Sequence, residues 1–138
     1  MKRITAFLFS AVLIISLALP ASAAVKETVQ PRYTYINSVY ASLSINEATG
    51  VTTCTGRVTA KNTYPVEVDV YLQQDMGSYW KTVKSWSATG NWSTSLTGNH
   101  AVYDGYTYRV YVVGYVYDSN GNLLESASGT HTVAYPSN

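Results

Sequence analysis

The sequence has a single cysteine, few helix-forming runs and no large excess of positive or negative charge. Cys54 is the single cysteine in 138 residues, which excludes an internal disulfide. Beyond the first 23 residues there is no Phe, while all 13 Tyr and all three Trp fall there with many Val, a composition that excludes a helical bundle and favours strands. Nine basic groups stand against eight acidic ones, so a protein built to bind nucleic acid is not expected.

The N-terminal segment predicts export. Lys2 and Arg3 precede an apolar run over residues 4–19, which Pro20 and the small residues 21–23 follow, an order typical of a secretory signal peptide. The run is shorter than the roughly 20 residues that a membrane span needs. We therefore expect a signal peptide over residues 1–23 and a secreted protein with no membrane anchor.

Cleavage is expected after Ala23, with Ala24 as the second choice. Removal of the signal would leave seven basic and eight acidic groups, a formal charge of −1, so an anionic membrane is not an expected partner.

The rest of the chain predicts one all-β domain. A short polar lead over residues 24–32 precedes a domain over 33–138, in which alternating apolar and polar residues are separated by turns at short intervals. With no room for a crossover helix, this pattern predicts a single seven-stranded antiparallel β-sandwich. The expected strands cover residues 39–45, 53–60, 66–73, 79–87, 92–97, 106–117 and 123–135.

The register of the last hairpin depends on the turn around Gly121. A two-residue turn at residues 120–121 would pair Val116 with Glu125 on the buried face. A three-residue loop with Gly121 in the left-handed conformation would pair Val116 with Leu124 and send Glu125 to solvent. We predict the second arrangement, because burial of an unpaired carboxylate costs several kcal/mol.

Residues 104–110, Asp-Gly-Tyr-Thr-Tyr-Arg-Val, resemble the entry to strand F of immunoglobulin-like and fibronectin type III domains. Tyr108 matches the tyrosine whose hydroxyl ties that corner to the backbone. Val110 stands where antibody-type domains have their second cysteine, so the resemblance does not extend to the inter-sheet disulfide.

The mature chain also resembles a group of small uncharacterised secreted proteins of Gram-positive gut bacteria of the Firmicutes type. The stretches that carry this resemblance are residues 31–35, Cys54, 80–87, 104–110 and 116–122. The resemblance implies the fold and the location, and it implies no activity.

Cys54 alternates in phase with Val58 and Ala60, which predicts a buried cysteine that packs as a small hydrophobic residue. The alternative is a thiol for a covalent dimer or an attachment.

The sequence predicts no enzyme. His100 and His131 have no acidic residue at the spacing of a catalytic triad or metal motif, and no nucleophile elbow is present. Glu67 and Asp69 share a strand face and are interpreted as cross-strand charge partners of Lys81, Lys84 or Arg109.

No cofactor and no metal site is expected. The polar residues of 118–125 have the types found in a calcium loop, but Gly121 stands at position four of that loop rather than six, so a hairpin explains them.

The distribution of Tyr is the most informative feature. If the even residues of 106–117 face the core, the odd residues and a neighbouring Tyr of strand 66–73 line an outer face, which predicts the binding residues Tyr71, Arg109, Tyr111, Tyr115 and Tyr117. The alternative is that these rings serve only as cross-strand packing. Trp80, Trp86 and Trp92 are interpreted as core or inter-sheet residues, one of which could join the outer face.

These features predict a secreted, non-catalytic, monomeric module that presents its Tyr-rich face to an extracellular glycan, a cell-wall polymer or a protein. The alternatives are a self-assembling structural surface protein and a small secreted antagonistic effector.

Overall fold

The computed structural model describes residues 32–138, which form strands, turns and loops. The predicted signal peptide, residues 1–23, and nearly all of the polar lead lie outside the described residues. Within residues 32–138 no helix is long and apolar enough to cross a membrane. The strands are β1 (Ile36–Ile45), β2 (Val51–Ala60), β3 (Pro65–Asp75), β4 (Trp80–Asn91), β5 (Ser93–Ala101), β6 (Tyr106–Tyr117) and β7 (Leu123–Tyr135).

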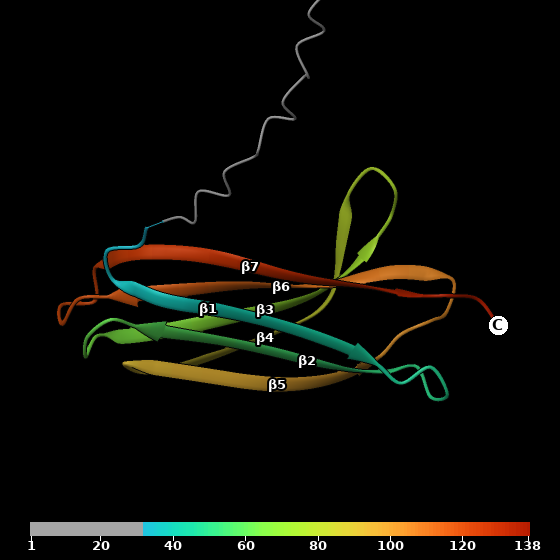
Figure 1. The fold of residues 1–138 in the computed structure, drawn as a ribbon, viewed down its shortest axis with the longest axis horizontal. Helices are drawn as coiled ribbons and strands as arrows, with labels where there is room; N and C mark the ends of the chain where they lie inside the picture. The colour runs from blue at the N-terminus through green and yellow to red at the C-terminus, as the bar shows by residue number, and fades with distance from the viewer. Residues whose placement is uncertain (1–31) are drawn as a thin grey trace, which may run out of the picture. The chain divides into compact units, whose positions relative to one another are not determined.

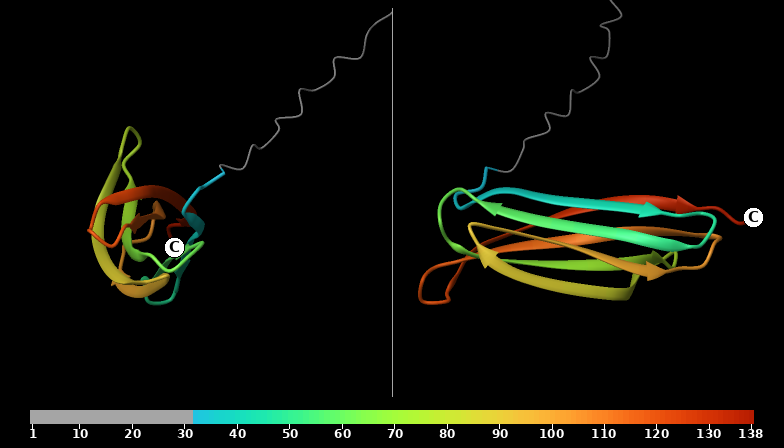
Figure 2. Two further views of the ribbon diagram at one scale, coloured as in Figure 1. Left: turned by 90° about the vertical axis from the view of Figure 1, so that its left-hand side faces the viewer. Right: turned by 90° about the horizontal axis from the view of Figure 1, so that it is seen from below.

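The strands pair antiparallel in the order β1-β2-β5-β4-β3-β6-β7. A single pair, Asn91 opposite Ser93, links β4 to β5, so the ladder divides there into the sheets β1-β2-β5 and β4-β3-β6-β7. Figures 1 and 2 show these two sheets as layers whose strands run along the long axis of the domain. The prediction of an all-β fold of seven antiparallel strands in two sheets is confirmed.

The core lies between the two sheets and follows from side-chain alternation. Its fully buried residues include Val66, Val68, Val70 and Leu72 of β3, Tyr108, Val110, Val112 and Val116 of β6, and Cys54, Val58 and Ala60 of β2. Burial of one such valine or leucine stabilises the fold by roughly 1.5–3 kcal/mol. Because successive side chains of a strand point to opposite faces, this core forces the odd-numbered residues of β3 and β6 outward.

Two glycines let the sheets approach closely. A Cβ atom on Gly56 would overlap Cγ2 of Val70, and one on Gly114 would lie 2.6 Å from Cγ2 of Val58. Each glycine of one sheet therefore makes room for a valine of the other sheet.

The passage from β4 to β5 differs from the prediction, in which one strand ended at residue 87 and the next began at residue 92. β4 extends to Asn91, and Trp92 alone makes the step into β5. Trp92 has a φ of 68°, which is unusual for a bulky residue, and its side chain is 53% exposed. Its backbone N–H donates to the carbonyl oxygen of Tyr64, and its carbonyl accepts from the N–H of Ala60, both at 2.8 Å. The interpretation of Trp92 as a core or inter-sheet residue is therefore wrong.

The loop between β6 and β7 contains Gly121 with a φ of 83°. The N–H of Asp118 donates to the carbonyl of Asn122 at 2.9 Å, which closes a loop of three residues. One carboxylate oxygen of Asp118 accepts from the N–H of Asn120 at 2.9 Å and from that of Asn122 at 2.8 Å, so the aspartate also holds the turn.

The register that follows this loop differs from the predicted one. Tyr117 pairs with Leu123, but Val116 pairs with Glu125, because a bulge leaves Leu124 as an extra residue in β7. The predicted pairing of Val116 with Leu124 is therefore wrong.

Glu125 is half-buried rather than turned to solvent. Its carboxylate accepts hydrogen bonds from the backbone N–H groups of Thr34, Tyr35 and Ile36 at 2.9, 3.0 and 2.8 Å. The assumption that a carboxylate on this face would be unpaired does not hold, because the first residue of β1 and the two residues before it supply its donors.

Tyr108 holds the connection between β5 and β6, which lie in different sheets. Its side chain is 1% exposed, and its hydroxyl donates to the carbonyl oxygen of Tyr103 at 2.8 Å. This bond fixes the chain where it enters the four-stranded sheet.

Candidate binding surface

The outer surface of the four-stranded sheet brings together all five residues predicted for binding. Tyr71 of β3 lies directly opposite Tyr111 of β6, and Gln73 lies opposite Arg109. We call this surface the tyrosine face; its central residues, all half-buried, are Glu67, Asp69, Tyr71, Gln73, Arg109, Tyr111, Val113, Tyr115 and Tyr117.

Hydroxyl-bearing residues flank the tyrosine face on both sides. From the strand pairings, those of β4 are Thr82, Ser85, Ser87 and Thr89, and those of β7 are Ser126, Ser128, Thr130 and Thr132. The aromatic strip is thus bordered by small hydrogen-bonding groups rather than by aliphatic side chains.

The tyrosine rings form two close pairs. The ring centroids of Tyr71 and Tyr111 lie 6.1 Å apart with an interplanar angle of 37°. Those of Tyr115 and Tyr117 lie 6.3 Å apart with an angle of 25°. Both distances fall within the range of favourable aromatic contact, so the rings order one another.

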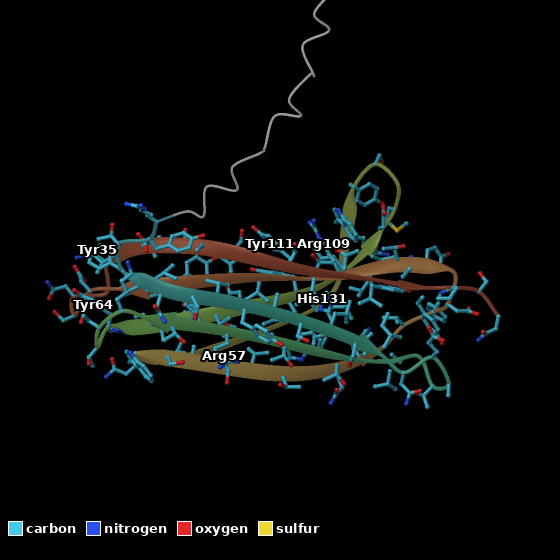
Figure 3. All side chains as sticks on the ribbon, viewed as in Figure 1. Tyr35, Arg57, Tyr64, Arg109, Tyr111 and His131 are labelled. Atoms are coloured by element: carbon cyan, nitrogen blue, oxygen red, sulfur yellow. The ribbon has the colours of Figure 1, made fainter. Side chains whose placement is uncertain are left out.

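Arg109 organises one end of the tyrosine face. Its guanidinium carbon lies 4.3 Å from the ring centroid of Trp80 and 5.5 Å from that of Tyr111, and its Nε donates to Oε1 of Gln73 at 2.7 Å. Figure 3 shows Arg109 and Tyr111 beside the base of the β3–β4 hairpin. The amide of Gln73 in turn donates to the hydroxyl of Thr82 at 3.1 Å.

The sequence pointed to Trp80 only as one of three candidates and did not point to Gln73. A bulge between Leu72 and Gln73 bends the β3–β4 hairpin, whose tip extends from the sandwich in Figure 1. Alternation alone could not predict this bulge. Of the other tryptophans, Trp86 packs against the core as interpreted.

The other end of the tyrosine face is acidic. Asp69 accepts a hydrogen bond from the hydroxyl of Ser87 at 2.7 Å and a longer one from that of Tyr71 at 3.5 Å. Glu67 accepts one from the hydroxyl of Tyr117 at 3.2 Å.

The lysine partners interpreted for these two carboxylates are wrong. Lys81 pairs with Gln74 and Lys84 with Leu72, whereas Asp69 lies opposite Ser87 on β4. Arg109, the third candidate, bonds Gln73 at the other end of the face.

Burial raises the pKa of Tyr71, Tyr115 and Tyr117 above the ordinary value of 10.0. The nearby carboxylates of Asp69 and Glu67 raise the pKa further, because a phenolate beside them would add a like charge. The three hydroxyls therefore remain protonated at neutral pH and can donate.

Two hollows lie at the acidic end of the tyrosine face. One, of about 240 Å³, is lined by Asp69, Tyr71, Ser85, Trp86 and Ser87. The larger, of about 610 Å³, lies at the end of the sheet and is lined by Pro65, Val66, Glu67, Thr89, Gly90, Tyr117, Asp118, Ser119 and Gly121.

The outer surface of the other sheet differs in kind. It carries hydroxyl pairs such as Thr55 with Thr97, 3.1 Å apart, and Thr59 with Ser93, 3.2 Å apart. Tyr40 on β1 lies beneath Arg57, with 5.2 Å from the guanidinium carbon to the ring centroid.

Cys54 is fully buried and is a free thiol. Burial raises the pKa of this thiol, and a hydrogen bond with Thr52 opposes the rise.

The two histidines are separate. Nδ1 of His131 accepts from the N–H of Leu43 at 2.9 Å, which ties β7 to β1, whereas His100 lines a hollow of about 170 Å³ beside Tyr108. Among residues 32–138 no group of three or more histidine, cysteine or acidic side chains is placed to hold a metal ion.

No protein-family model matches the chain, and no curated protein matches it significantly. By its strand arrangement and its outer surface, the described part of the chain is a two-sheet β-sandwich with an aromatic strip on one outer face.

Proposed function

We propose that the chain is a secreted, non-catalytic binding module with an immunoglobulin-like or fibronectin type III-like fold, whose tyrosine face binds an extracellular or cell-wall glycan. The observation that carries this proposal is the strip of four rings, with Tyr71 and Tyr111 6.1 Å apart and Tyr115 and Tyr117 6.3 Å apart. A tyrosine ring offers a broad apolar face together with a hydroxyl, which suits the apolar faces and hydroxyl groups of sugar rings.

Two features support the fold assignment. The strands divide into sheets of three and four, and the hydroxyl of Tyr108 bonds the carbonyl of Tyr103 at the corner before β6. Export is supported by the charged, apolar and small-residue order of residues 1–23.

The surroundings of the rings favour a glycan over a protein partner. Protein interfaces concentrate their affinity in an apolar centre that excludes water. Here Val113 is the one aliphatic residue among the central residues of the tyrosine face, and Ser and Thr of β4 and β7 border it. Such a surface can exchange hydrogen bonds with many hydroxyl groups while the rings stack.

The exposed edge of the four-stranded sheet argues for a monomer. Lys81 and Lys84 lie on β4, which pairs with β5 only at Asn91 and Ser93, so most of β4 is an edge. Lysines on an edge strand oppose the pairing of two copies.

Co-sedimentation of the purified protein with isolated cell walls and insoluble polysaccharides tests the proposal. The test variant is Tyr111→Ala with Tyr115→Ala, checked for folding by circular dichroism. Tyr40→Ala, on the outer surface of the other sheet, is the matched control. We expect the native protein and the control to be retained and the double variant to be lost.

Retention of all three proteins would place binding elsewhere and contradict the role of the tyrosine face. Retention of none would leave the rings as sheet packing and contradict the proposed function. Sedimentation that increases with protein concentration in the absence of polymer would favour self-assembly.

A further inference from the structure

We infer that the acidic end of the tyrosine face binds a polysaccharide whose sugars carry protonated primary amines, that is, a deacetylated amino-sugar polymer. This inference rests on the proposed function and specifies the ligand class of the same surface.

Charge is separated along the tyrosine face. Arg109 lies at one end, where its guanidinium is engaged by Trp80, Tyr111 and Gln73. Glu67 and Asp69 lie toward the other end. The charge of the tyrosine face that remains for a ligand is therefore negative. It comes from these two carboxylates, which lie among aromatic rings.

The partners of these carboxylates are neutral. Ser87 and Tyr71 donate to Asp69, and Tyr117 donates to Glu67. An ionised carboxylate has about four acceptor sites, so both retain capacity for a further donor. A cation that reached them would add a charge-assisted hydrogen bond, which is about twice as strong as a neutral one.

Each carboxylate borders a hollow that also has an aromatic wall. Asp69 shares the hollow of about 240 Å³ with the outward-facing ring of Tyr71. Glu67 shares the groove of about 610 Å³ with Tyr117. An ammonium group placed there would contact a carboxylate and the face of a ring at once, and both attract a cation.

The spacing of the two sites indicates a polymer with repeated amines. Glu67 and Asp69 are two residues apart on β3, which separates their attachment points by roughly 7 Å. A primary ammonium has three donors and so can bond a carboxylate and a neighbouring hydroxyl such as that of Ser87. The sugar ring that carries the amine would stack on the tyrosines, as the proposed function requires.

The test compares binding to chitin particles, whose amines are acetylated, with binding to the same particles after deacetylation. The test variant is Glu67→Gln with Asp69→Asn. The matched control is Glu47→Gln with Asp104→Asn, which removes the same charge from two exposed residues away from the tyrosine face. Folding of each variant is checked by thermal unfolding.

We expect the native protein and the charge control to bind deacetylated particles at least about fivefold more tightly than chitin. The Glu67→Gln, Asp69→Asn variant should lose this preference and keep any binding to the acetylated particles. Soluble glucosamine oligomers should compete more effectively than polylysine of equal charge.

Equal binding to both particles with loss in the Tyr111→Ala, Tyr115→Ala variant would overturn the inference and leave the proposed function intact. Equal loss in both acidic variants, or equal competition by polylysine, would reduce the effect to net charge and also overturn it. Absence of binding to every polymer, cell walls included, would overturn both.

Discussion

Tyr71 and Tyr111 stand directly opposite one another on β3 and β6, with their ring centroids 6.1 Å apart at an angle of 37°. The pair spans β3 and β6, the two central strands of the four-stranded sheet. The buried residues on the other face of these strands hold both strands in place. Rings held in this way lose little rotamer freedom when a ligand binds, which lowers the entropic cost of recognition.

The contact between these rings should be measurable as a coupling. In a double-mutant cycle, Tyr71→Ala and Tyr111→Ala should together cost less than the sum of the single changes, by about 0.2–1 kcal/mol of unfolding free energy. Urea unfolding of the four proteins measures this. Strict additivity of the two changes would mean that the rings do not stabilise one another.

Glu125→Gln should destabilise the domain, because it replaces the carboxylate that accepts three backbone hydrogen bonds from Thr34, Tyr35 and Ile36. We expect a loss of about 1–2 kcal/mol, below the sum for three charge-assisted bonds because the site is partly open to water. Denaturant unfolding measures the loss. Glu47→Gln, at an exposed residue of the loop between β1 and β2, is the control and should be close to neutral.

The same carboxylate predicts part of the pH dependence of stability. Burial alone would raise the pKa of Glu125, but the N–H groups of Ile36, Thr34 and Tyr35, with Lys61, lower it below the ordinary value of 4.5. A lowered pKa in the folded state gives stability that is fully present above pH 4.5 and is lost as the pH falls through the folded-state pKa. Unfolding curves across this window should show a smaller dependence on pH for Glu125→Gln; an identical dependence would refute the assignment.

Gly56→Ala should destabilise the domain by about 1–3 kcal/mol, because the new methyl group would overlap Val70 of the opposite sheet. Gly129→Ala on β7 is the matched control, since a Cβ there would lie 3.8 Å from Val39 and meet ordinary contact distances. Thermal and denaturant unfolding of both variants give the comparison. Equal stability of the two would show that the sheets can separate without cost at Gly56.

Cys54 should react with a thiol reagent only after unfolding. The side chain is fully buried and burial raises its pKa, so both access and the thiolate fraction are low in the folded protein. Labelling at pH 8 with and without denaturant, followed by mass spectrometry, measures the rates. Rapid labelling of the folded protein would support the alternative of an attachment or dimer thiol.

The strand faces could be predicted because each depends on a local period of two. The buried residues of β3 and β6 alternate with outward neighbours that are polar or aromatic, with Val113 as the one aliphatic exception. A slip of one residue would expose the whole apolar set. The same argument placed Tyr71, Tyr111, Tyr115 and Tyr117 on one outer surface. The direction of each side chain needed no knowledge of the partner strands, whereas the place of Tyr71 beside the β6 tyrosines depends on the pairing of β3 with β6.

The features that the sequence did not predict depend on contacts between distant segments. The carboxylate of Glu125 finds its donors at residues about 90 positions earlier, so the penalty assumed for burying it does not arise. Trp92 takes a left-handed conformation because its backbone bonds Tyr64 and Ala60 where the chain changes sheet. Neither relationship has a local signal.

By itself the sequence determined the all-β class, the inward and outward residues of the central strands and the gathering of Tyr111, Tyr115 and Tyr117 on one face of β6, since alternation and composition act locally. Only the tertiary structure decided the pairing of Val116 with Glu125, the place of Trp80 beside Arg109, and the neutral partners of Glu67 and Asp69. Each of these depends on a bulge or on which strand lies next to which, and both are chosen by the packing of the whole domain.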